Sequence, residues 1–79
     1  MTRLEVLSSL PKEDVQIIRL CESSIEDQKL ARAEFGPEYE QSFVELESVM
    51  RDTIEVLVAR RFGKKDFARA LKALRKGRW

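Results

Sequence analysis

The chain has 79 residues, a formal net charge of +1, 43% hydrophobic residues and 37% charged residues. This composition is too apolar for a disordered chain and rather charged for a compact monomer, so it predicts one small domain of long, partly exposed helices. No apolar run approaches the length of a membrane span.

The few glycines and prolines separate long stretches that contain neither residue. No segment alternates apolar and polar residues as a β-strand does, so every predicted element is a helix. The first is a short helix within residues 1–10, where Thr2 followed by Glu5 fits a capping box. Ser9 and Pro11 then indicate the N-cap and first turn of a second helix, over residues 11–35. Its apolar stripe consists of Ile17, Ile18, Cys21, Ile25 and Phe35.

A tight corner at Gly36 and Pro37 follows, with Gly36 suited to the left-handed position that ends a helix. The third helix is predicted over residues 37–62, antiparallel to the second. Its apolar stripe consists of Phe43, Leu46, Met50, Ile54, Leu57 and Val58. Val49 and Val56 widen this stripe on one side, whereas Glu45, Asp52 and Glu55 fall opposite it.

The last helix is predicted over residues 66–76, with Asp66 as its N-cap. One face carries Phe67, Ala70, Leu71 and Leu74, and the opposite face carries basic residues. The expected fold class is therefore all-α: an antiparallel helical hairpin of two long helices flanked by short N- and C-terminal helices, forming a single domain over residues 1–79.

Charge is strongly divided along the chain. Residues 1–58 hold six bases and thirteen acids, a net charge of −7, whereas residues 59–79 hold nine bases and one acid, a net charge of +8. The near neutrality of the whole is thus a cancellation between an acidic body and a basic end.

The residue inventory argues against an enzyme. Without histidine there is no histidine base, no catalytic triad that uses one and no histidine metal ligand, and one cysteine cannot build a zinc site. We therefore predict no catalytic residues, no metal and no cofactor. The lone Cys21 excludes an intrachain disulfide, and residues 1–10 lack the apolar core of a secretory signal, so we expect a cytoplasmic protein.

The leading interpretation is a non-catalytic helical interaction protein, acting as a regulator, adaptor or inhibitor by binding a larger protein or protein assembly. A first alternative is a small nucleic-acid-binding protein whose basic residues replace counterions on phosphates. The residues that would contact a partner or nucleic acid are Lys65, Arg69, Lys72, Arg75, Lys76 and Arg78. The plain competing interpretation is that this basic face is only solvated, beside the acidic body.

A second alternative for the function involves the acidic part of the chain. An acidic hairpin, with Glu45, Asp52 and Glu55 on its outer side, could occupy the basic nucleic-acid-binding groove of a partner as an inhibitor. A membrane surface is disfavoured, because the terminal helix is short and its apolar face includes alanine. The small size and the extra apolar edge of Val49 and Val56 also predict an antiparallel homodimer.

Overall fold

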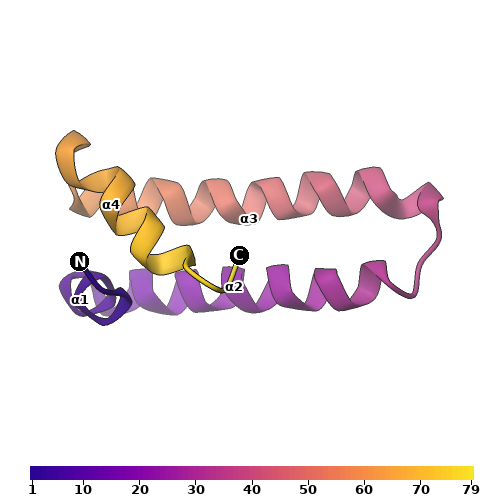
Figure 1. Ribbon diagram of the computed structural model, residues 1–79, viewed down its shortest axis with the longest axis horizontal. Coiled ribbons are helices and arrows are strands. Elements are labelled where there is room, and N and C mark those ends of the chain that lie inside the picture. Colours follow the sequence, from indigo (N-terminus) through magenta and orange to yellow (C-terminus); the bar gives the residue numbers. More distant parts are fainter.

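The computed structural model describes residues 1–79 and confirms the predicted fold class: two long antiparallel helices with a short helix before and after them (Figure 1). The two short helices, α1 and α4, pack against each other at the open end of the hairpin, and α4 also contacts α3. The molecule extends over 40 × 22 × 19 Å. The elements are α1 (Arg3–Ser9), α2 (Lys12–Arg32), a 3-10 turn η1 (Pro37–Tyr39), α3 (Glu40–Arg61) and α4 (Lys64–Arg75).

The residues that cap the N-termini of the helices agree only in part with the caps predicted from the sequence. The Thr2 hydroxyl accepts a hydrogen bond from the Glu5 amide at 3.2 Å, as the capping box predicts. Ser9 is not the N-cap of α2: its hydroxyl donates to the Val6 carbonyl at 2.8 Å, and Pro11 occupies the cap position instead. Asp66 lies in the first turn of α4 rather than at its N-cap, which is Gly63.

The corner between the long helices is wider than predicted. The α2 helix ends at Arg32, and the chain continues through Ala33 to Gly36 before the 3-10 turn begins at Pro37. The left-handed conformation expected at Gly36 is wrong, since this residue has an ordinary φ of −79° and ψ of 172°. The residue with a positive φ is Gly77, at 72°, and it turns the chain after α4.

The hydrophobic core lies at the open end of the hairpin, where all four helices meet. On the tip side of this core the next buried side chain is polar: Gln28, whose amide nitrogen donates to the Ser24 hydroxyl at 3.0 Å while its Oε1 has no partner. Residues 29–53 contribute no buried side chain. The core consists of Val6, Leu10, Ile18, Cys21, Ile25, Ile54, Leu57, Val58, Ala70, Leu71 and Leu74.

The tip of the hairpin consists of two helices without a third layer. The expected core positions Phe35 and Leu46 are therefore exposed, because α1 and α4 reach only the open end. The Phe35 ring instead stacks edge-on against Tyr39, with centroids 5.3 Å apart, and against Phe43 at 5.8 Å. Arg32 joins α2 to α3 here through ion pairs with two glutamates, Glu40 and Glu47.

Candidate functional site

The α4 helix is divided into a buried face and an exposed face. Ala70, Leu71 and Leu74 are buried in the core, and Phe67 is partly buried against it. Because each residue advances the helix by about 100°, the residues opposite this buried face project into solvent. These exposed residues form what we call the basic face of α4: Lys65, Arg69, Lys72, Arg75 and Lys76.

The positive charges of this basic face are almost unused by the fold. Arg69 forms an ion pair with Asp66 at 3.6 Å, and both side chains are at least half exposed, so the pair contributes little. Lys65, Lys72, Arg75 and Lys76 have no carboxylate within 4.0 Å. The arginines that pair with the acidic hairpin are others, namely Arg3, Arg32 and Arg51.

Three members of the basic face surround one hollow. Arg69, Lys72 and Lys76 line a depression of about 240 Å³, together with Met1 and Ala73. Cations that converge on one concave surface raise the local positive potential and the local concentration of anions. The arrangement can therefore receive an anionic group such as a phosphate or a carboxylate.

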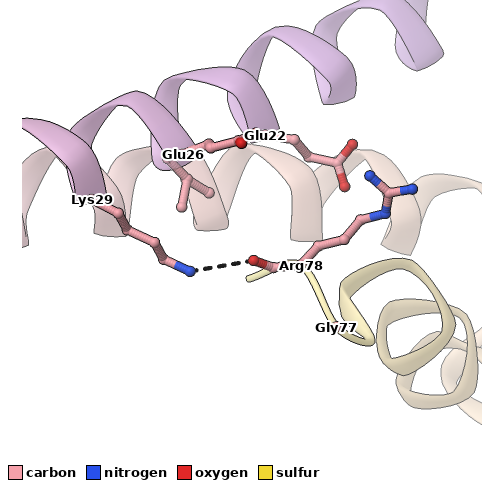
Figure 2. Close-up of a pocket in the computed structure, with 6 residues that line it drawn as sticks. Glu22, Glu26, Lys29, Gly77 and Arg78 are labelled. Atoms are coloured by element: carbon pink, nitrogen blue, oxygen red, sulfur yellow. Dashed lines mark hydrogen bonds between the residues drawn. The ribbon is translucent and has the colours of Figure 1, made fainter.

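Arg78 does not join this face, although the sequence placed it there. Its carbonyl accepts a hydrogen bond from the Lys29 ammonium at 3.3 Å, and its guanidinium points toward Glu22 on α2 (Figure 2). The residue lines a separate pocket of about 240 Å³ whose other lining residues include Glu26 and Gly77. The turn at Gly77 thus carries Arg78 away from α4 and onto the hairpin.

A clamp that the sequence did not predict fixes the end of the chain. The Arg3 guanidinium donates to both carboxylate oxygens of Glu22, at 2.6 and 2.7 Å, and the Trp79 indole N–H donates to the same carboxylate at 2.8 Å. On the α3 side, Arg51 donates to the Trp79 carbonyl at 3.0 Å and lies over its ring. Trp79 therefore bridges the two long helices.

The pKa values of Glu22 in the clamp and of the neighbouring Cys21 are shifted. Burial alone would raise the pKa of Glu22, but the hydrogen bonds from Arg3 and Trp79 and the nearby positive charges outweigh burial and lower this pKa below its ordinary value. Burial next to Glu22 raises the pKa of the Cys21 thiol. This thiol is thus held protonated, as a small apolar side chain of the core.

The acidic face of the third helix is more mixed than predicted. Glu45 and Asp52 are exposed and Glu55 is half-buried. Asp52 and Glu55 line a depression of about 340 Å³, but Arg51 lines it too. The positive charge of the Arg51 guanidinium partly neutralises the negative charge of this surface.

Val49 and Val56 lie on another side of α3, and both are exposed. With Thr53, Leu57 and polar neighbours they line a shallow depression of about 350 Å³. Val49 and Val56 are the exposed apolar residues of this hollow, whereas Leu57 belongs to the buried core.

No group of three or more Cys, Asp or Glu side chains is arranged to hold a metal ion. None of the helices combines the length and the apolar character needed to cross a membrane. No protein-family model, curated protein or solved structure matches the chain.

Proposed function

We propose that this chain is a non-catalytic binding protein that contacts a larger, negatively charged macromolecule with the basic face of α4. The observation that supports this proposal is the contrast between the two sides of one helix. The apolar side is buried in the core, whereas the basic side is exposed and has no carboxylate partner outside α4. The fold therefore needs the apolar side and leaves the charges free for a partner.

Nucleic acid is the candidate partner that the placement of charge favours. The tip half of the hairpin, residues 26–49, holds seven acids and two bases, a net charge of −5, and the rest of the chain has a net charge of +6. The tip, at Pro37–Tyr39, lies at the end of the molecule away from α4, which runs from the open end only to the middle of the hairpin (Figure 1). Since charges are screened over about 8–10 Å at physiological salt, the acids near the tip repel a polyanion bound at the start of α4 only weakly.

The dimensions of the basic face agree with this candidate. Lys65 and Lys76 are eleven residues apart, which corresponds to about 16 Å along the helix axis. A DNA duplex presents one phosphate charge per about 1.7 Å of its axis, so several phosphates fall within reach of the face. An acidic protein surface is the other class of partner, with charges that are sparser and less regular.

A pair of matched variants tests the proposal. Lys72→Gln with Lys76→Gln removes two charges from the basic face, and Lys12→Gln with Arg19→Gln removes two exposed charges elsewhere. We expect random DNA and RNA duplexes to bind the unmodified chain at low salt, with a log–log salt slope of about −0.9 per phosphate contacted. The α4 variant should weaken binding and flatten the slope, whereas the control should change both much less.

Polyglutamate serves as the probe for the other class of partner. Binding of polyglutamate but not of duplexes would replace nucleic acid by an acidic protein surface as the partner. If neither probe binds at low salt, or if the control variant weakens binding as much as the α4 variant, the basic face of α4 is not a contact surface.

A further inference from the structure

One side of the helical hairpin is uncovered. Trp79 contacts Glu22 of α2 and Arg51 of α3, so the C-terminal segment covers one side of both helices. Residues about 180° around each helix from these contacts must face the other way. Leu20 lies about 200° from Glu22, and Val49 lies about 200° from Arg51, because each is two residues away.

This side, which we call the bare face, carries exposed apolar residues beside polar ones such as Arg60. Its α2 members Ile17 and Leu20 are exposed, and its α3 members Leu46, Val49 and Val56 are exposed as well. Along α3 the residues Leu46, Val49, Thr53 and Val56 follow one another at spacings of three, four and three, which is the spacing of a seam between packed helices. A seam pattern without a partner helix indicates a missing layer.

The accessible surface of the chain is larger than its mass requires. It measures 5673 Å² for a protein of 9.2 kDa. A compact monomer of this mass exposes about 4,900 Å², so the excess is about 750 Å². A standard protein interface buries about 800 Å² from each partner. The excess therefore matches the area that one copy contributes to a dimer.

We propose that a second copy of this chain covers the bare face and completes an antiparallel four-helix bundle. A two-fold axis between two stacked hairpins can run along the helices or across them. An axis along the helices places the basic end of one copy over the basic end of the other. Across the helices, it places the basic end of each copy over the acidic tip of the other, with α3 stacked on α3. With α3 stacked on α3, the arrangement across the helices brings the open end of one α3, which carries the exposed Arg60, over the tip end of the other, which carries the exposed Glu45, and these opposite charges favour it.

The dimer is independent of the function proposed for α4. The α4 helix and the C-terminal segment lie on the side of the hairpin that faces away from the bare face, so dimerisation leaves the basic face exposed. The loss of one activity therefore does not imply the loss of the other. Each is measured by its own experiment.

Sedimentation equilibrium at tens of micromolar tests the dimer. We expect twice the protomer mass of 9.2 kDa for the unmodified chain. Val49→Glu should return the protomer mass, whereas Val44→Glu should remain a dimer. These two valines are 54% and 45% exposed on different sides of α3, so both variants add the same charge with similar exposure. A protomer mass for the unmodified chain, or the same mass for both variants, would overturn the proposal.

Two measurements test the orientation. Added NaCl should weaken the dimer if oppositely charged ends face each other, and should strengthen it if like ends do. In an antiparallel α3 pair centred on this seam, Val49 of one copy lies opposite Thr53 of the other, so the double variant Val49→Cys with Thr53→Cys should form disulfides between two copies under mild oxidation, whereas Ser48→Cys on the outer side should not. The unmodified chain is the control, because Cys21 is buried. Strengthening by NaCl, or no cross-link between residues 49 and 53, contradicts the antiparallel arrangement.

Discussion

Replacing Leu74 by alanine tests whether the apolar side of α4 holds this helix on the hairpin. The Leu74 side chain is fully buried among residues of all four helices. The substitution removes three carbon atoms, worth about 0.8 kcal/mol each in transfer free energy, and leaves a cavity. Leucine-to-alanine changes in cores cost about 2–5 kcal/mol. A domain of 79 residues has a total stability of about 4–12 kcal/mol, so the loss is a large fraction of it.

The assay is thermal and urea unfolding followed by circular dichroism. A loss of about 3 kcal/mol in a domain this small should lower the melting temperature by about 12–24 °C. Leu30→Ala is the matched control, because this leucine is 69% exposed and its loss should change stability by less than about 0.5 kcal/mol. The charge variant at Lys72 and Lys76 should also melt like the unmodified chain. An unchanged melting curve for Leu74→Ala would show that α4 is not docked through its apolar side.

Three further predictions concern polar and backbone features of the fold. Gln28→Leu should raise the free energy of unfolding by about 1–2 kcal/mol in urea melts, because Oε1 of Gln28 is buried without a partner; a loss of stability would mean that the hydrogen bond to Ser24, which the substitution also removes, contributes more than the unpaired oxygen costs. Gly77→Ala should cost about 1–2 kcal/mol, because φ is 72° there, and should expose the single tryptophan to solvent, as read by its fluorescence. Glu22→Gln should cost about 1–3 kcal/mol at pH 7, where the charged carboxylate holds Arg3 and Trp79. Because the pKa of Glu22 is lowered on folding, its contribution is complete above the unfolded value of about 4.3 and is lost as the pH falls through the folded pKa. The stability difference between Glu22→Gln and the unmodified chain should therefore shrink below about pH 4, and a difference that persists there would contradict the assigned role of the charge.

The hairpin and the division of α4 could be predicted because both follow from local periodicity. The spacing of Ile18, Cys21 and Ile25 on α2, and of Ile54, Leu57 and Val58 on α3, corresponds to the buried side of each helix. Helix boundaries were predicted wrongly where two sequence signals competed. At residue 9 the serine hydroxyl bonds backward to Val6 instead of capping the next helix, a choice between two neighbouring partners that the sequence alone does not decide.

The extent of the core could not be predicted, because periodicity does not show how far a third layer reaches. Phe35 and Leu46 continue the apolar stripes toward the tip, yet α1 and α4 are too short to cover them. The clamp could not be predicted from the sequence either. Glu22 and Trp79 are 57 residues apart, and no local pattern marks either as the partner of the other. Only the fold brings these two side chains together.

The two proposed surfaces reinforce each other when considered together. The clamp ties the segment after α4 to α2 and α3, and the apolar side of α4 is buried in the core, so the basic face is presented in one orientation. In the antiparallel dimer the two basic faces lie at opposite ends of the bundle and on its outer sides. These two faces point in opposite directions, so a stiff duplex that lies on one face does not reach the other, and one dimer contacts two separate duplexes instead. The unmodified chain should therefore bridge pairs of duplexes, and Val49→Glu should abolish this bridging while leaving binding to a single duplex unchanged.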